Sequence, residues 1–271
     1  MTEATATPAP APGPSPRWFL ARALGGFGPK LALFDAALVT VAAIVVAIAW
    51  RVGGGAKASY EQLVPWVGTS LRWSVALPIA WSALGAIEAD RRDGLLALAM
   101  RRGLSARRWL LGRALGTGAV VFASVGAPMI VLSMVLAGFG GGVEGALARL
   151  SLVIPSIGVV AATALVFGIG AAALGALFPS RPVIFGVLLG AAALGALAEL
   201  ALPGLLGASA HQLVSPFDAL ADLQAAAFDE PQSRARGVSA LASVLVMSFA
   251  AVRVAAMACA DEVERARARR P

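Results

Sequence analysis

The sequence predicts an all-α, polytopic membrane protein with six transmembrane helices. The mean hydropathy is +0.81, and 59% of the residues are hydrophobic whereas only 14% are charged. In a soluble domain about a quarter of the residues are charged. Long apolar runs recur along the chain, and its 271 residues accommodate roughly six spans of about 20 residues with their loops.

The charge, cysteine and histidine content narrows the function classes. The formal charge is +7, but no basic patch alternates with exposed aromatic residues, so we expect no nucleic-acid partner. Cys259 is the only cysteine, which excludes an intramolecular disulfide, and no metal site is expected. The only histidine, His211, lies in a predicted outer segment and is interpreted as solvated or interfacial. An intramembrane enzyme is disfavoured because no predicted span contains a histidine.

The N-terminal region contains two different segments. Residues 1–16 form a Pro/Ala tract without apolar periodicity, and we expect this tail to be disordered. Residues 17–28 place tryptophan, phenylalanine and leucine beside Arg17 and Arg22. This composition is typical of a short helix lying at the membrane interface.

The six predicted spans form one domain over residues 17–260, followed by a cytoplasmic tail at 261–271. The spans cover residues 31–50, 68–87, 109–137, 150–178, 182–202 and 238–260. A loop over 51–67 is expected to join the first two, and a longer segment of mixed polarity, 203–237, to precede the last. Asp35, Glu199 and Arg253 fall near span ends. Each is interpreted as reaching the interface, with a substrate-path role as the alternative.

The orientation follows from the distribution of positive charge. With a cytoplasmic N-terminus, the inner segments hold 15 Lys and Arg residues and the outer segments hold six. The positive-inside rule therefore predicts a multi-pass protein of the cell (inner) membrane, with both termini in the cytoplasm.

The segment from Glu88 to Arg113 is the most distinctive part of the chain. It contains seven arginines and three acidic residues between two apolar runs. Hydrocarbon does not accommodate that density of charge, so the segment is expected in water or at the membrane surface. The arginines are Arg91, Arg92, Arg101, Arg102, Arg107, Arg108 and Arg113.

This segment also predicts a short capped helix. Asp93 and Gly94 are expected to open it and Gly103 to close it in the left-handed conformation. Its apolar surface consists of Leu95, Leu96, Leu98 and Met100. Ser105 is expected to cap the next helix, with Leu104 and Trp109 at the positions of a hydrophobic staple. An ordinary basic loop explains the arginines, but it does not explain a capped apolar helix.

The whole arrangement resembles the permease subunits of type-2 ABC exporters. Glu88 is similar to the family's glutamate after span two, and Gly94 and Leu96 match the run that follows it. Arg113 takes the basic position early in span three, and SPFDAL (215–220) is similar to a recurring segment before the last span. Leu95 and Ala97 depart from the pattern, since the family usually has a hydroxyl and an acid there.

The resemblance implies a permease that moves a substrate by using ATP hydrolysis in a separate ABC ATPase subunit. The chain itself is then no enzyme and binds no cofactor, and ATP and Mg belong to the ATPase. It implies a second permease copy and a cytoplasmic coupling helix between spans two and three. The alternative is a non-transporting membrane scaffold that recruits a cytoplasmic partner through its basic loop.

The predicted site residues form two groups. Small residues allow helices to approach closely in lipid, so Gly186 and Gly190 are the candidate interface with a second copy. The predicted contacts to the ATPase are Glu88, Arg91, Arg92, Asp93, Gly94, Leu95, Leu96, Leu98, Met100, Arg101 and Arg102.

Overall fold

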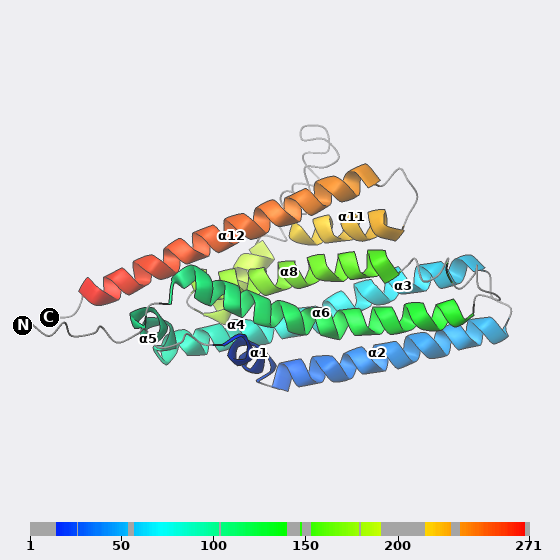
Figure 1. The fold of residues 1–271 in the computed structure, drawn as a ribbon, viewed down its shortest axis with the longest axis horizontal. Coiled ribbons are helices and arrows are strands. Elements are labelled where there is room, and N and C mark those ends of the chain that lie inside the picture. Colours follow the sequence, from blue (N-terminus) through cyan, green and yellow to red (C-terminus); the bar gives the residue numbers. More distant parts are fainter. Residues whose placement is uncertain are drawn as a thin grey trace, which may run out of the picture.

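The chain folds into a bundle whose long helices run along one axis, with the short helices α1 and α5 lying across it (Figure 1). The computed structural model describes residues 15–25, 27–53, 57–102, 104–139, 147, 153–178, 180–190, 215–228 and 234–268. Within these ranges every element is helical and there is no strand. The all-α prediction is confirmed for this part of the chain.

In chain order, the helices are α1 (Pro16–Leu24), α2 (Phe27–Val52), α3 (Lys57–Leu71), the π-helical η1 (Arg72–Ala76), α4 (Leu77–Arg92), α5 (Leu95–Arg101), α6 (Ala106–Gly138), α8 (Val153–Leu177), an unlabelled helix Arg181–Gly190, α11 (Pro216–Phe228) and α12 (Arg234–Ala268). The helix predicted over 17–28 is present as α1, which ends four residues earlier.

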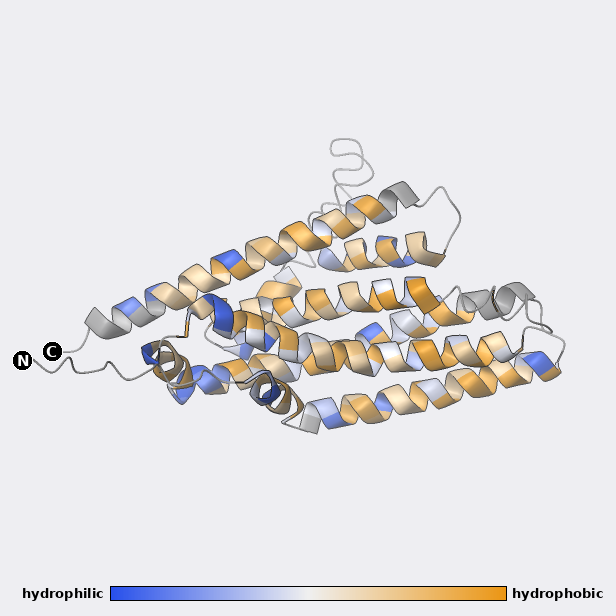
Figure 2. Cartoon of the chain, viewed as in Figure 1, coloured by the Kyte–Doolittle hydropathy of each residue, from blue (hydrophilic) through white to orange (hydrophobic). Residues whose placement is uncertain are grey.

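Four helices are long and apolar enough to cross a membrane, so the chain is a multi-pass membrane protein. They cover Gly28–Val52, Ala106–Gly138, Val153–Leu177 and Gly237–Asp261, at the positions of the predicted spans one, three, four and six. Figure 2 shows apolar residues along these helices and hydrophilic residues gathered around α5 and the neighbouring ends of α4 and α6.

The second predicted span lies inside a continuous helical stretch formed by α3, η1 and α4, from Lys57 to Arg92. The loop expected over 51–67 is therefore wrong from residue 57 onward. Pro78 has no backbone N–H for the carbonyl of Ser74, and the preceding turn widens, with the Leu77 N–H bonded to the Arg72 carbonyl. A local π-helical turn thus accommodates Pro78, and the helix continues beyond it.

Other predicted segments are described only in part. The fifth predicted span begins as the ten-residue helix Arg181–Gly190, and its remainder, 191–202, lies outside the described residues, with Glu199. The tail at 1–14, Gly103 and His211 also lie outside them. The mixed segment 203–237, expected as an outer loop, contains the helix α11.

The centre of the bundle is the pair α6 and α8, which cross with their backbones in near contact. A Cβ added to Gly168 would lie 2.5 Å from the Ala114 carbonyl oxygen, and one on Gly118 would lie 3.1 Å from the Ala164 carbonyl oxygen. Helices in lipid gain little from burying apolar surface against each other, so close contact through small residues is an effective way to pack them. By contrast, α2 and α12 lie at the edge and expose apolar side chains such as Val45 and Phe249.

Candidate functional site

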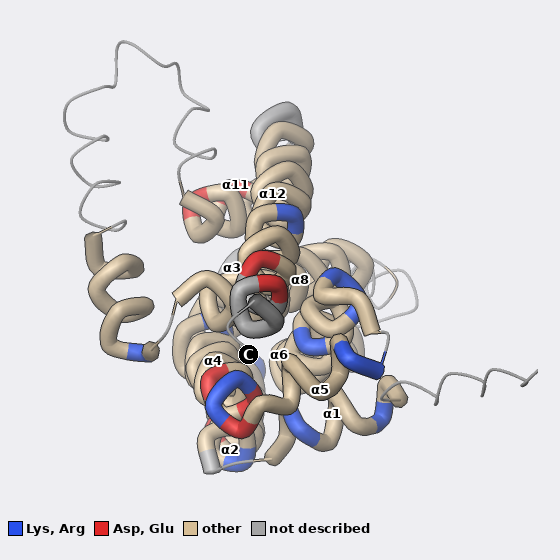
Figure 3. The backbone as a smooth tube through the Cα atoms, turned by 90° about the vertical axis from the view of Figure 1, so that its left-hand side faces the viewer, with Lys and Arg blue, Asp and Glu red and all other residues tan. Residues whose placement is uncertain are grey.

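The charged residues gather at one end of the bundle, where α1, α5 and the C-terminal end of α12 lie (Figures 1 and 3). Figure 3 views the molecule onto this end and shows Lys and Arg on α1, α4, α5 and the start of α6, and acidic residues on α4 and near the C-terminal end of α12. The central charged segment of the sequence thus forms one face of the structure.

The turn between α4 and α5 is built by Gly94. Its φ of 71° is the only positive value among the described residues, and its N–H bonds to the Arg91 carbonyl at 3.2 Å. Glycine adopts this left-handed conformation without a steric penalty. Asp93, which we expected to open the short helix, instead caps the end of α4, with its N–H bonded to the Ala89 carbonyl at 2.8 Å. The short helix begins at Leu95.

The turn between α5 and α6 is also closed by hydrogen bonds. The Leu104 N–H bonds to the Ala99 carbonyl at 3.1 Å, which is the six-residue bond of a Schellman motif. Ser105 caps α6, accepting a hydrogen bond from the Arg108 N–H at 3.3 Å, as predicted. Leu104 and Trp109 belong to the same apolar cluster.

The apolar residues of α5 do not share one environment. Leu96 is buried in the cluster around Trp109, whereas Leu98 is 45% exposed. Leu95 and Met100 are half-buried, and Arg101 and Arg102 are exposed. Leu96 therefore anchors α5 to the bundle, and Leu98 with the two arginines presents the outward surface of the predicted contact set.

Arginines and acidic residues of α4 connect it to its neighbours. Arg91 donates to the carbonyls of Gly175 and Phe178 at the end of α8, at 3.2 and 3.1 Å. Glu88 accepts from Arg92 at 3.1 Å and lies 3.7 Å from Arg181 Nε. The C-terminal turn of α4 is thereby tied to α8 and to the helix Arg181–Gly190.

Asp90 is the buried centre of this end. Its side chain is 0% exposed, it accepts from Arg22 of α1 at 3.1 Å, and it pairs with the buried Arg113 of α6. The Arg113 guanidinium also lies over the rings of Trp18 and Trp109, at 4.9 and 5.6 Å from their centroids. One carboxylate therefore joins α1, α4 and α6.

The sequence reasoning did not single out Asp90 or Arg22. The available signal was helical spacing, because Asp90 follows Ala83 and Ile87 on the buried face of α4. Phe19 of α1 is buried against α6, where Cβ atoms on Gly112 and Gly116 would meet it at 2.5 and 2.9 Å. A Gly-x-x-x-Gly pair on α6 thus seats α1 on the bundle.

A second buried arginine lies away from the charged end. Arg72, in the π-helical turn η1, is buried, and its Nη2 donates to Gln224 Oε1 of α11. Gln224 Nε2 in turn donates to the Pro65 carbonyl at 2.6 Å and to Thr69 Oγ1 at 2.8 Å. This network attaches α11 to the α3–η1 stretch.

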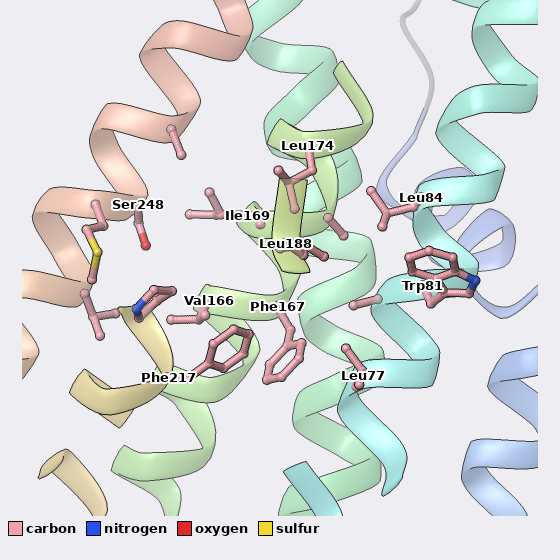
Figure 4. Close-up of a pocket in the computed structure, with 17 residues that line it drawn as sticks. Leu77, Trp81, Leu84, Val166, Phe167, Ile169, Leu174, Leu188, Phe217 and Ser248 are labelled. Carbon is pink, nitrogen blue, oxygen red and sulfur yellow. The ribbon is translucent and has the colours of Figure 1, made fainter. Parts of the chain in front are cut away.

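An apolar cavity of about 180 Å³ lies between α4, α8, α11, α12 and the helix Arg181–Gly190 (Figure 4). Trp81, Phe167, Phe217 and Leu188 line it, and Ser248 contributes the hydroxyl in its wall. The cavity offers space to an apolar group and no charged partner among its lining residues.

The remaining predicted residues are more dispersed. Cβ atoms on Gly186 and Gly190 would meet nothing within 4 Å, so this surface is open in the described part of the single chain. Asp35 Oδ2 is buried without a hydrogen-bond partner among the described residues, and Arg253 is exposed. In the described ranges, no group of three His, Cys, Asp or Glu side chains is placed to hold a metal ion.

This end of the molecule thus carries a short helix that is held by a turn at each end and anchored by Leu96, with an exposed leucine and two exposed arginines on its surface. The ion pairs beside it belong to α4. In comparisons with known proteins, no family model, curated protein or solved structure matches this chain.

Proposed function

We propose that this chain is the membrane-spanning permease subunit of an ABC exporter, which works with a separate ATPase subunit and a second permease copy. The observation that carries the proposal is α5, a short helix fixed at the charged end of a bundle of membrane-spanning helices, with Leu98 exposed. A loop that only keeps positive charge at the membrane surface does not require a short helix held in a fixed position.

The contacts of α5 suggest how movement is transmitted. Gly94 joins α5 directly to α4, and Arg91 at the end of α4 is bonded to the last carbonyls of α8. A push on α5 therefore moves α4 and α8 together, and rigid-body motion of packed helices is a recognised mode of switching. In this proposal ATP closes the ATPase pair, and the spans switch between inward and outward access.

The proposal includes six spans with both termini in the cytoplasm. The continuous stretch Lys57–Arg92 is long enough to serve as the second span, and Arg181–Gly190 is the start of the fifth. The open surface around Gly186 and Gly190 is the proposed contact with the second copy, because no described side chain of this chain covers it.

The test is association with an ABC ATPase from the same genome after Leu98→Asp. An aspartate there places a charge in an apolar contact, and we expect normal membrane insertion but loss of ATPase co-purification and of ATP-driven transport. Reversing Arg101 and Arg102 to Glu is expected to have a milder effect, because exposed ion pairs contribute only about 0–1 kcal/mol each.

The matched control is Val52→Asp, which adds the same charge at an exposed apolar residue at the C-terminal end of α2. It should leave the association intact. Full co-purification and transport by the Leu98→Asp variant would contradict the proposed contact. Capture of a different cytoplasmic protein, without any ATPase, would favour the membrane scaffold instead.

A further inference from the structure

A cleft at the charged end is not used by the proposed coupling. It has a volume of about 550 Å³ and lies between α1, the middle of α4 and Arg181. Trp18 and Arg22 line it from α1, Ser82 and Gly85 line it from α4, and the Arg181 guanidinium packs over Gly85. A side chain at position 85 would occupy the space of this guanidinium, so the glycine admits Arg181 to the cleft.

The cleft carries surplus positive charge. Arg22 shares the carboxylate of Asp90 with Arg113, and Arg181 shares that of Glu88 with Arg92. Four arginines therefore have two acidic partners among the described residues. In the described part of the chain the buried Arg22 Nε has no hydrogen-bond partner, and Arg181 Nε, 3.7 Å from a Glu88 carboxylate oxygen, makes no hydrogen bond. The excess of arginines over carboxylates leaves the cleft able to accept a further anion.

Both arginines remain reachable from outside. Their side chains are 39% and 41% exposed, and Ser82 lies in the same wall. A phosphate bound here would accept hydrogen bonds from two guanidinium groups, the arrangement in which arginine binds phosphate most strongly.

Apolar side chains lie next to residues that line the cleft. Phe185 lies one helical turn beyond Arg181, is 58% exposed and meets the ring of Trp81 edge-on, with the centroids 6.3 Å apart. Trp18 lines the same cleft from the interfacial helix α1, and tryptophan is enriched at the level of lipid headgroups. Polar contacts for a headgroup thus lie beside apolar surface for acyl chains.

We propose that this cleft binds the headgroup of an anionic phospholipid, with its phosphate between Arg22 and Arg181 and its acyl chains along Phe185. Basic pockets between membrane helices on the cytoplasmic side are known to take such headgroups. The lipid would fill the space between α1 and α4 and stabilise the position of α1. This site does not depend on the partner or transport activity proposed above.

The full-length protein is first placed in nanodiscs that contain equal amounts of phosphatidylglycerol and phosphatidylcholine, and is then transferred into detergent. The experiment measures how much of each lipid remains bound to it. We expect phosphatidylglycerol to be retained preferentially. Arg181→Gln should lower its retention about fivefold, and Arg22→Gln/Arg181→Gln further, because each arginine near an anionic lipid contributes roughly that factor. The single variant leaves the Asp90 contacts in place, so a folding defect of the double variant does not obscure the result.

The control is Arg107→Gln/Arg108→Gln, which removes two exposed arginines from the same end but outside the cleft. An equal loss in this control would overturn the proposal in favour of unspecific attraction. Equal retention of the two lipids would also overturn it. In a third arm, millimolar inorganic phosphate should not displace the lipid; displacement at that concentration would overturn the proposal by showing that the site recognises a free anion.

Discussion

Two regions of this protein each bury an arginine, and they compensate for the cost of burying its charge in different ways. At the charged end, Arg113 has a carboxylate from Asp90 and the faces of Trp18 and Trp109. In the α3–η1 region, the hydrogen-bond partner of Arg72 within the described ranges is the neutral oxygen of Gln224. The first arrangement neutralises the charge, whereas the second satisfies a hydrogen bond without an opposite charge.

This difference shows which interactions hold each region together. The charged end joins three helices through one buried carboxylate. The middle of the bundle relies on backbone contact at Gly118 and Gly168 and on amide hydrogen bonds. Ion pairing therefore joins α1, α4 and α6 at the charged end, whereas backbone contact holds α6 against α8.

The largest effect is expected for Asp90→Ala. This change leaves Arg22 and Arg113 without their shared acceptor, and removing one partner of a buried pair costs about 3–5 kcal/mol. We expect a marked fall in the thermal stability of the purified protein, measured by loss of the monodisperse peak after heating. Asp90→Leu/Arg113→Met should recover part of the stability, and a double variant as unstable as Asp90→Ala would argue against pairing as the cause.

A smaller loss is expected for Gln224→Leu. The buried Arg72 then loses its acceptor on α11, and a hydrogen bond to a charged group contributes about 1.5–3 kcal/mol. Arg72→Met/Gln224→Leu should cost less than the sum of the single changes, because the two residues act as a pair. Strict additivity in the same melting measurement would show that the contact carries no coupling energy.

Gly168→Ala tests the packing of the middle directly. The new methyl would lie 2.5 Å from the Ala114 carbonyl oxygen, so α6 and α8 must separate, at a cost of about 1–3 kcal/mol. Gly170→Ala in the same helix is the control, because its Cβ would meet nothing within 4 Å. Equal melting temperatures for the two variants would contradict the close contact.

The smallest effect is expected for Ser105→Ala at the charged end. It removes the hydroxyl that caps α6, and losing such a cap lowers the free energy of unfolding by about 1 kcal/mol. Ser105→Asp retains an acceptor and should keep the stability of the original chain. A loss of equal size in both variants would mean that the cap contributes nothing and that the position is sensitive for another reason.

The site was predictable where local chemistry decides it. The Ser105 cap and the glycine turn at Gly94 could be predicted because each depends on a few adjacent residues, whereas the expected turn at Gly103 lies outside the described residues. The role of Asp93 was misassigned, since the left-handed Gly94 makes it the end of α4. Leu96 and Leu98 could not be separated by type, because their burial depends on where Trp109 packs.

The sequence by itself determined the helical class, the membrane-spanning character and the position of the charged segment, because hydropathy and charge act locally against lipid and water. Only the tertiary structure decided that Asp90 accepts from Arg22 and Arg113, that Arg72 meets Gln224, and that Gly118 and Gly168 bring two backbones together. These contacts join residues far apart along the chain, 152 positions in the case of Arg72 and Gln224, and no local pattern records which helix faces meet.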